Sequence, residues 1–423
     1  MSTALAVLAT LVAAAVFLGI GANLSTAEKR LRHRPQPLYG SDAPDFKRAL
    51  GILLGPPLVG GNHVTTLVNG DQIFPSMLEA IESARVTIAF ETFVFRDEVG
   101  GRFCAALSRA AKRGVKVHIL LDWVGSSKMD TALLENTRKA GCDVELYHPL
   151  SWIHLGRLNN RTHRKLLVVD GRVGFTGGVG MGNEWIGNAE DPKHWREMHY
   201  RVEGPVVSQM QAVFIDNWIK ATGHILHGPD YFPTEDVNAG DMEAQMFGSS
   251  PSGGSESMHL MILLALTAAR KTIDIENAYF VPDPLTMEAL VAAAKRGVRV
   301  RVVVPGRHTD ARVGRWAAQA LYGDLMKAGI EIHEYQRTMI HCKVLVIDGA
   351  WTSVGSANFD DRSFRLNDEA NLNVFSEELA DAQVRQIEED IRHSKKMSPR
   401  RWARRMVSRR IYERLALLMR SQL

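Results

Sequence analysis

The sequence predicts an α/β protein built from two homologous lobes, preceded by a transmembrane helix and followed by a basic helical tail. Two observations predict the lobes: segments after residue 60 occur twice in the same order, and each copy alternates helical patterns with β-branched runs. A third observation, an uncharged N-terminal stretch, predicts the membrane helix. Of the 423 residues, 45% are hydrophobic and 23% are charged, which argues against a disordered chain, a collagen-like fibre and a polytopic membrane protein.

The uncharged stretch at residues 3–22 predicts a transmembrane anchor. As a helix it would extend about 30 Å, the thickness of the hydrocarbon core of a bilayer. A cleaved signal peptide is the alternative, but the stretch lacks a basic start and exceeds the usual apolar length of about 7 to 15 residues. Basic residues follow within residues 29–34, so the positive-inside rule places the main body on the cytoplasmic side of the cell inner membrane.

The duplication is visible in three pairs of segments. "TIAFETFVF" around Glu91 returns as "TIDIENAYF" around Glu276, "AAKRGVKVHILLD" returns as "AAKRGVRVRVVVP", and "KAGCDVELY" returns as "KAGIEIHEY". A repeat of this length predicts duplicated domains and not a solenoid. The expected parts are an anchor at 3–22, a basic juxtamembrane linker at 23–59, a first lobe at 60–240, a connector rich in Gly and Ser at 241–258, a second lobe at 259–390 and a basic amphipathic tail at 391–423.

A fourth pair of segments carries chemical groups. "HRKLLVVDGRVGFTGG" begins at His163 and "HCKVLVIDGAWTSVGS" begins at His341, so both read H-x-K-x-x-x-x-D. In an extended strand residues i and i+2 share a face, which places Lys165 beside His163 and Lys343 beside His341. One such match carries a real risk of chance, whereas two matches at the same place in two repeats are a strong signal. The motif aspartates, Asp170 and Asp348, each precede a turn glycine, and their role stays open between capping that turn and taking part in chemistry.

These residues resemble the phospholipase D superfamily, whose signature is the doubled motif. Within it, "GSANFDDRSFRLNDEANL" in the second half and "HWREMHYRVEGPVV" in the first half look like the bacterial cardiolipin synthases. The resemblance covers nearly the whole chain after residue 60. It implies two phospholipase D-like α/β lobes, related by pseudo-twofold symmetry and packed so that both motifs meet in one active site.

The chemistry of phosphodiester transfer suits the residue types of the motif. The transition state gathers negative charge on the phosphoryl oxygens, and Lys165 and Lys343 supply two fixed cations for it. Histidine, with a pKa near 6.5, provides one neutral imidazole to attack phosphorus and one protonated imidazole to release the alcohol. Following the family, His163 is expected to be the nucleophile that forms a phosphohistidine, and His341 the general acid and then base. The reverse assignment stays open.

The resemblance also implies the supporting residues of the site. Glu197 and Glu369 match the carboxylates that orient each histidine through its other ring nitrogen, and Gly178, Ser356 and Asn358 match phosphate-binding positions. One position departs from the family: the asparagine usual at the second residue after the Gly-Gly pair is replaced by Gly180. Either a closely approaching backbone N–H at Gly180 or the side chain of Asn183 could substitute for it.

No cofactor is expected. Residues 174–182 complete neither G-x-G-x-x-G nor a Walker lysine pattern, and no convincing carboxylate cluster is present to hold a metal. The sequence therefore predicts a membrane-associated phosphatidyltransferase that makes cardiolipin from two phosphatidylglycerol molecules and releases glycerol; phosphatidylethanolamine could replace one of them. The alternatives are a phospholipase D-type hydrolase, a nuclease and a non-catalytic membrane scaffold.

The C-terminal tail favours a lipid partner over nucleic acid. Residues 391–423 carry eleven Lys and Arg against one Glu, in a chain whose formal charge is only +4. Apolar residues recur among the arginines at helical spacing, a composition suited to an anionic membrane surface. A basic tail with one Trp does not by itself separate lipid from nucleic acid, but the N-terminal anchor does, because a nuclease has less need of it. The apolar positions are Trp402, Met406, Val407, Ile411, Leu415 and Leu418.

Overall fold

The computed structural model describes residues 31–36, 39–149, 159–234, 238–250 and 257–422. The transmembrane helix predicted at residues 3–22 lies outside these ranges. Within them, no helix is both long enough and apolar enough to cross a bilayer.

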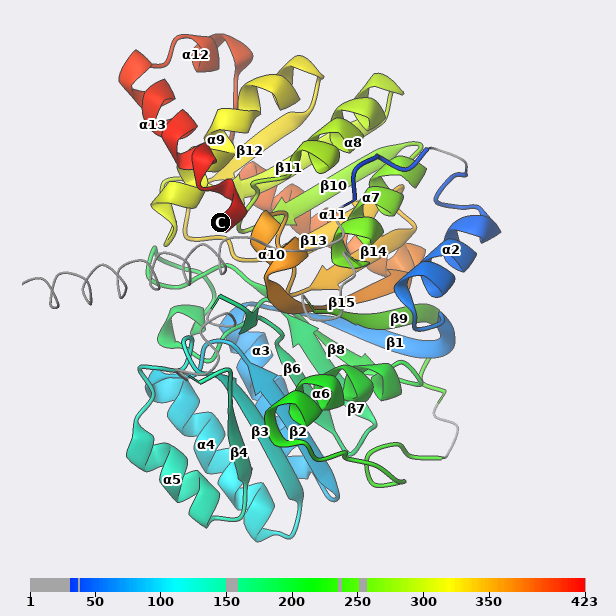
Figure 1. Cartoon of the computed structure of the whole chain (residues 1–423), viewed down its shortest axis with the longest axis vertical. Helices are drawn as coiled ribbons and strands as arrows, with labels where there is room; N and C mark the ends of the chain where they lie inside the picture. The colour runs from blue at the N-terminus through cyan, green and yellow to red at the C-terminus, as the bar shows by residue number, and fades with distance from the viewer. Residues whose placement is uncertain (1–30, 37–38, 150–158, 235–237, 251–256, 423) are drawn as a thin grey trace, which may run out of the picture.

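Two lobes with the same strand order make up the body of the protein (Figure 1). The strands of the first lobe run β4-β3-β2-β6-β7-β8-β1 across the sheet, and those of the second run β12-β11-β10-β13-β14-β15-β9. The duplicated α/β architecture predicted from the repeats is therefore confirmed. The first lobe contains β1 (Val59–Val68), α3 (Asn69–Ser83), β2 (Thr87–Thr92), α4 (Asp97–Lys112), β3 (Lys116–Asp122), α5 (Thr131–Lys139), β4 (Asp143–Tyr147), β5 (Arg161–Thr162), β6 (Leu166–Val169), β7 (Val173–Gly177), η2 (Asn183–Trp185), β8 (Met198–Glu203) and α6 (Val207–Thr222).

The second lobe repeats the first and adds elements at its C-terminal end. Its helices and strands are β9 (Met242–Ser249), α7 (Ser257–Ala268), β10 (Thr272–Asn277), α8 (Pro284–Lys295), β11 (Arg299–Pro305), α9 (Arg312–Lys327), β12 (Glu331–Tyr335), β13 (Lys343–Ile347), β14 (Trp351–Gly355), α10 (Asp361–Arg365), β15 (Asn367–Phe375), α11 (Glu377–Arg392), β16 (Ser394–Lys396), α12 (Pro399–Ala403), α13 (Val407–Leu418) and η4 (Arg420–Gln422). The inner strands β2, β10 and β13 are β-branched and almost wholly buried, as a sheet covered by helices on both faces requires.

The two lobes join edge to edge into one continuous sheet. Strand β1 of the first lobe pairs antiparallel with β9 of the second, with Asn62 opposite Met242. A second link is formed by β5, which pairs in parallel with β15 of the other lobe. These pairings bring the motif ends of the two lobes together at the interface, where a shared hydrophobic core also forms.

Three of the expected boundaries differ from the structure. Residues 242–249, expected in the connector, form strand β9, because their buried side chains complete the second-lobe sheet. The expected linker contains α2 (Pro44–Leu54), whose Phe46 ring contacts Trp351 and Phe375 at 5.9 Å between ring centroids. The expected tail begins inside the second lobe, since β16 pairs with β12 and α13 packs on α9.

The two motif aspartates lie away from the histidines. Each follows the motif strand whose N-terminal side carries the histidine, and each lies in a tight turn with positive φ, 53° at Asp170 and 55° at Asp348. The Asp170 carboxylate accepts hydrogen bonds from the backbone N–H groups of Val86 and Thr87, at 2.8 and 2.9 Å. The Asp348 carboxylate accepts equivalent bonds at the start of β10. Of the two roles left open by the sequence, this geometry favours the structural one.

Replacing Asp170 with alanine is therefore expected to destabilise the protein without removing its chemistry. The substitution removes several hydrogen bonds to a charged carboxylate, and alanine adopts the left-handed backbone of this position less readily than aspartate does. The free energy of unfolding should therefore fall by about 2–4 kcal/mol. Denaturant unfolding measures this loss, and turnover per folded molecule should stay within about threefold of wild type. Asp170→Asn should lose less stability. A loss of more than about 100-fold in turnover by fully folded Asp170→Ala would instead place the carboxylate in the chemistry.

Candidate active site

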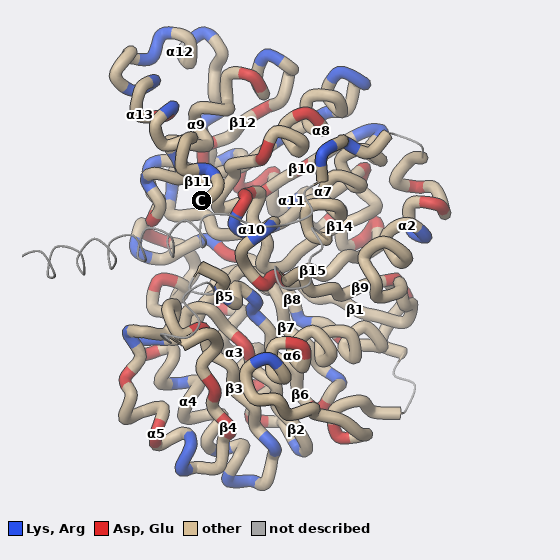
Figure 2. The backbone as a smooth tube through the Cα atoms, in the orientation of Figure 1, with Lys and Arg blue, Asp and Glu red and all other residues tan. Residues whose placement is uncertain are grey.

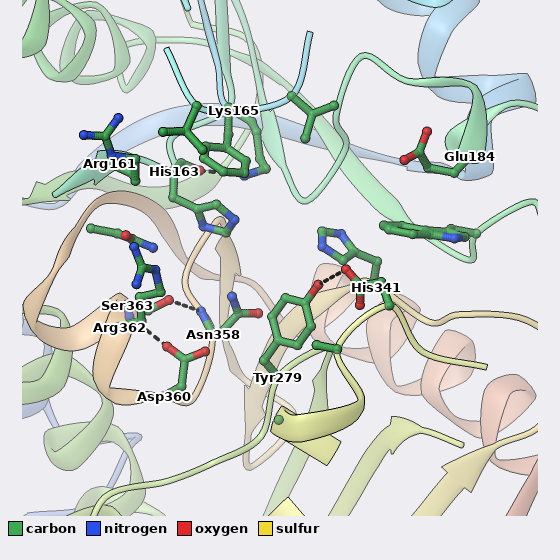
Figure 3. Close-up of a pocket in the computed structure, with 18 of the residues that line it drawn as sticks. Arg161, His163, Lys165, Glu184, Tyr279, His341, Asn358, Asp360, Arg362 and Ser363 are labelled. Carbon is green, nitrogen blue, oxygen red and sulfur yellow. Dashed lines mark hydrogen bonds between the residues drawn. The ribbon is translucent and has the colours of Figure 1, made fainter. Parts of the chain in front are cut away.

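The two motif histidines line one cavity at the junction of the lobes. His163 lies between β5 and β6, and His341 lies directly before β13. Both line a cavity of about 490 Å³, and Figure 3 shows their imidazoles facing one another across it. The convergence expected of the duplicated motif is therefore present in the structure.

Each histidine is held by the other lobe. The Nδ1 atom of His163 lies 3.0 Å from the Glu369 carboxylate, and that of His341 lies 2.7 Å from Glu197. The backbone repeats this exchange: His163 N–H donates to the carbonyl of Asp368 at 2.9 Å, and His341 N–H donates to the carbonyl of Arg196 at 2.8 Å. Folding of either lobe alone would leave its histidine without its carboxylate.

The two carboxylates fix the tautomer of the imidazoles. Burial alone would raise the pKa of Glu369, but His163, Lys165 and a serine hydroxyl outweigh it and lower that pKa. Glu197 behaves alike, since hydrogen bonding and charge from His341 and Lys343 overcome burial and lower its pKa. An ionised carboxylate can only accept a hydrogen bond, so each Nδ1 carries a proton. Nε2 of His163 is left for the chemistry in the cavity, whereas Nε2 of His341 also lies 3.2 Å from Lys343 Nζ.

The motif lysines lie beside the histidines as their spacing predicts. Lys165 Nζ donates to the His163 carbonyl at 2.7 Å, and Lys343 Nζ donates to the His341 carbonyl at 2.5 Å. Burial lowers the pKa of Lys165 to about 7, with Glu369 opposing and Lys343 adding to the effect. Burial also lowers the pKa of Lys343, against the charge of Glu197. An anionic phosphoryl group between these ammonium groups would hold both of them in the charged form.

The carboxylates are oriented by different donors in the two lobes. Ser356 Oγ and Ser363 Oγ both donate to Glu369, the latter at 2.8 Å. Trp185 Nε1 donates to Glu197 at 3.3 Å. Trp185 precedes Ser363 by the same number of residues that separates His163 from His341, so an indole N–H takes the place of a hydroxyl.

Two glycines of the first lobe make room for this arrangement. A Cβ atom at Gly178 would lie 2.5 Å from the Glu197 carboxylate oxygens, and one at Gly180 would lie 2.7 Å from the ring of Trp185. Gly180 therefore stands where the family usually has asparagine because the Trp185 ring fills the space of that side chain. Among the described residues that line the cavity, Asn358 is present and Asn183 is not, so the amide is supplied by the second lobe alone.

The coupling between Gly180 and Trp185 gives a testable outcome. Gly180→Asn alone is expected to displace the indole, release Glu197 and lower activity at least about tenfold. Adding Trp185→Ser should recover part of that loss, because it opens the space and restores the hydroxyl found at Ser363. Turnover and melting temperature of the two single variants and the double variant measure the effect. Losses that simply add would show that the two positions are independent.

The structure thus sorts the predicted site residues into three groups. His163, Lys165, His341 and Asn358 line the cavity. Glu197, Glu369, Lys343, Ser356 and Gly178 lie behind the cavity-lining groups, where Ser356 binds Glu369 instead of facing the cavity as a phosphate ligand would. Asp170 and Asp348 are remote from it. Residues that sequence reasoning missed are Trp185, Ser363, Tyr279, Asp310, Arg161 and Arg362; the repeat offset could have revealed the first two.

The pKa values of the site predict an acidic optimum for kcat/KM. Burial lowers the pKa of His163 to about 4, with Glu369 opposing and Lys165 reinforcing it, so this imidazole stays neutral well below pH 6.5. Burial and Lys343 lower the pKa of His341, against Glu197, so its proton is lost as the pH rises through a value below 6.5. Above about pH 7 the charge of Lys165 is lost as well. We expect a bell-shaped profile for kcat/KM between pH 3.5 and 9; a flat profile from pH 5 to 8 would contradict it.

In the described part of the chain, no three His, Cys, Asp or Glu side chains are arranged to hold a metal ion. The three cysteines, Cys104, Cys142 and Cys342, are buried free thiols.

A duplicated fold in which two buried histidine and lysine sets share one cavity defines a phosphoryl-transfer enzyme of the phospholipase D type. The family described as "Cardiolipin synthase, PLD-like domain" matches residues 77–218 and 262–391, and the chain belongs to this family. The family predicted from the sequence motifs is therefore confirmed.

Similar proteins agree with this membership. Cardiolipin synthase 1 of Bacillus anthracis is 32% identical over 369 residues, which cover 85% of this chain and 72% of that protein. The cardiolipin synthase of Geobacillus kaustophilus (strain HTA426) is 33% identical over 366 residues, covering 86% and 73%. The crystal structure of phosphatidylserine synthase from Haemophilus influenzae Rd KW20 matches with a TM-score of 0.68 at 14% identity, over 90% of this chain and 100% of that chain, which shows a shared fold.

Proposed function

We propose that the protein is a membrane-associated phosphatidyltransferase that makes cardiolipin from two phosphatidylglycerol molecules and releases glycerol. The observation that carries this proposal is the pair of imidazoles, one from each lobe, that face each other across a single cavity (Figure 3). The two Nδ1 atoms are held by carboxylates, so the Nε2 atoms can carry out the chemistry. Nε2 of His163 can attack phosphorus from one side, and Nε2 of His341, which lies 3.2 Å from Lys343 Nζ, can protonate the leaving oxygen on the other.

The first step forms a covalent intermediate. Neutral His163 attacks the phosphorus of the first phosphatidylglycerol through Nε2, and a P–N bond forms as the P–O bond to glycerol breaks. His341, as the imidazolium, donates its Nε2 proton to the leaving glycerol oxygen. Lys165, Lys343 and the amide of Asn358 stabilise the charge on the phosphoryl oxygens, and all three lie at or directly behind the cavity wall.

The second step transfers the phosphatidyl group. His341 is now neutral and takes the proton from the terminal hydroxyl of a second phosphatidylglycerol. That oxygen bonds to phosphorus as the P–N bond breaks, which returns both histidines to their starting protonation states. One phosphodiester replaces another, so no nucleotide is consumed.

Apolar side chains around the cavity favour transfer to a lipid over hydrolysis. Phe93, Val94, Val124, Trp185 and Val281 line it, and such a wall disfavours free water beside the phosphohistidine. Phosphatidylethanolamine remains a second donor in this scheme, since the phosphoryl chemistry is the same for both lipids.

Product analysis tests the proposed function most simply. The full-length protein is given vesicles of pure phosphatidylglycerol, and lipids are identified by mass spectrometry. We expect cardiolipin and glycerol in equal amounts. Phosphatidic acid as the sole lipid product would select a hydrolase, and salt-sensitive cleavage of DNA or RNA after removal of the first 30 residues would select a nuclease. An unchanged lipid composition would favour the alternative of a non-catalytic membrane scaffold.

The location at the cell inner membrane is part of the proposal. The segment 3–22 supports a single-pass anchor by its composition. In the tail, Trp402 is buried with its ring centroid 5.4 Å from that of Tyr322. The exposed apolar side chains lie on α13 and at its N-cap: Met406, Val407, Ile411, Leu415 and Leu418. Lys and Arg lie along the same region (Figure 2), and this combination suits an anionic lipid surface. Ile411→Ser with Leu415→Ser is expected to weaken flotation of the protein with anionic vesicles; unchanged flotation of a variant that also lacks residues 1–30 would contradict this role of the tail.

A further inference from the structure

An aromatic ring and the motif lysine flank each of the two histidines, although the two rings differ by one position in the repeat, where Tyr279 aligns with Val94. Phe93 lies edge-on to His163 with ring centroids 5.5 Å apart, and Lys165 Nζ lies 5.7 Å from the centre of the Phe93 ring. Tyr279 lies edge-on to His341 at 5.9 Å, with Lys343 Nζ 5.9 Å from its ring centre. Each aromatic ring follows the strand, β2 or β10, that pairs with the motif strand of its own lobe. The two ends of the cavity therefore contain the same kinds of side chain, an aromatic ring and a lysine beside a histidine.

A polar pair distinguishes the end at His341. The Tyr279 hydroxyl donates to Asp310 Oδ2 at 2.7 Å, and both residues line the cavity. Figure 3 shows Tyr279 directed toward the His341 side. After the corresponding strand of the first lobe the cavity wall is formed by Val124, beside a phenylalanine ring that has no hydroxyl. The Tyr279 hydroxyl and the Asp310 carboxylate thus distinguish this part of the wall from the Phe93 and Val124 part at His163.

The pair is suited to accepting hydrogen bonds from a ligand. Burial and the charge of Asp310 raise the pKa of the Tyr279 phenol, so it remains a donor at neutral pH and holds the carboxylate in place. An ionised carboxylate has about four acceptor positions, of which Tyr279 uses one. Asp310 is itself exposed at the cavity wall, so a ligand in the cavity can reach it.

We propose that Tyr279 and Asp310 form a recognition site for the head-group alcohol, with Asp310 accepting a hydrogen bond from a hydroxyl or ammonium group next to the reacting carbon. This deepens the proposed function and rests on it, because it requires His341 to protonate the leaving alcohol and later to activate the incoming one. The charged groups that face His341 are Glu197, Lys343 and Asp310, and only Asp310 belongs to the open cavity wall.

The chemistry of the head groups fits this site. In phosphatidylglycerol the carbon next to the reacting one carries a hydroxyl, and in phosphatidylethanolamine it carries an ammonium group. Either donor can reach Asp310 while the reacting oxygen lies at His341. The same contact would select the terminal hydroxyl of a second phosphatidylglycerol over water, because water has no tethered second donor. Phosphatidylmethanol has no such donor and serves as the reference substrate.

The test compares head groups in matched variants of the full-length protein. Wild type, Asp310→Ala, Tyr279→Phe and the control Tyr231→Phe are assayed with vesicles containing phosphatidylglycerol, phosphatidylethanolamine or phosphatidylmethanol. Tyr279→Phe removes the hydroxyl and keeps the ring, and Tyr231 binds His118 outside the site. We expect Asp310→Ala to lower the ratio of kcat/KM for phosphatidylglycerol to that for phosphatidylmethanol at least about tenfold, Tyr279→Phe to lower it less, and the control to keep the wild-type ratio.

The outcomes show separately which head-group donor binds Asp310 and whether Asp310 recognises the head group at all. Loss with phosphatidylglycerol alone assigns the contact to a hydroxyl, loss with phosphatidylethanolamine alone assigns it to an ammonium group, and loss with both supports either donor at the same carboxylate. The proposal would be overturned, even if wild type makes cardiolipin, if Asp310→Ala left kcat/KM for both phosphatidylglycerol and phosphatidylethanolamine unchanged relative to phosphatidylmethanol, or lowered kcat/KM equally for all three lipids. Absence of turnover by wild type with every lipid would instead reject the proposed function.

Discussion

Replacing His163 with alanine is expected to reduce cardiolipin formation by about four orders of magnitude. The Nε2 atom that attacks phosphorus is lost, and the chemistry then depends on direct attack by a hydroxyl at a phosphodiester. The neighbouring groups that bind the phosphoryl oxygens remain, so lipid binding should change little. Product formation in phosphatidylglycerol vesicles measures kcat, and binding of the variant to the same vesicles measures the remaining affinity.

A control variant separates this effect from misfolding. Histidine in a buried network contributes to stability as well, so His163→Ala must be compared with His163→Gln, which keeps a side-chain amide near Glu369. Both variants should retain cooperative unfolding and both should lack turnover. Turnover by either folded variant within about tenfold of wild type would show that His163 is not the nucleophile.

Exchanging Glu369 for glutamine is expected to lower kcat by about two to four orders of magnitude. The carboxylate accepts from Nδ1 of His163 at 3.0 Å, and an amide at this place would permit the wrong tautomer. The steady-state rate and the pH profile check the result. Glu197→Gln should have a comparable effect through His341, to which that carboxylate lies at 2.7 Å.

The crosswise pairing makes this second prediction specific. Glu369→Gln added to His163→Ala should cost little more, since the carboxylate then has no histidine to orient. Ser353→Ala provides a matched change, because this buried residue binds Asn371 of the same lobe and does not touch the histidines. The additional loss of kcat caused by Glu369→Gln is compared in two backgrounds, His163→Ala and His341→Ala. A larger additional loss in the His163→Ala background would contradict the pairing across the lobes.

Much of the fold follows from local patterns in the sequence. The repeats around Glu91 and Glu276 gave the two lobes, and the doubled motif identified His163 and His341 as one set, because each of these signals lies within a few residues of a strand. The contacts between each histidine and the glutamate of the other lobe could not be predicted from the sequence. Glu369 is 206 residues from His163 in the chain, and only the pairing of β1 with β9 and of β5 with β15 brings them together.

Individual positions failed to be predicted for separate physical reasons. Gly180 looked like a missing phosphate ligand, whereas the structure shows that the Trp185 ring occupies its space. Ser356 matched a phosphate-binding position, but its hydroxyl is turned to Glu369 behind the cavity. Asp310 carries no motif at all, since it follows β11 in a loop and enters the cavity wall only through tertiary packing.

In the proposed mechanism, two histidines from different lobes act on one phosphorus atom, and His163 carries the phosphatidyl group. The most direct measurement is rapid quenching of the full-length protein with ³²P-labelled phosphatidylglycerol, followed by mass spectrometry of the labelled peptides. We expect up to one labelled phosphoryl group per chain on the peptide that contains His163, none in His163→Ala, and loss of the label into cardiolipin when unlabelled phosphatidylglycerol is added. Label on the His341 peptide, or cardiolipin formed in the first turnover with no labelled peptide at any time, would contradict it.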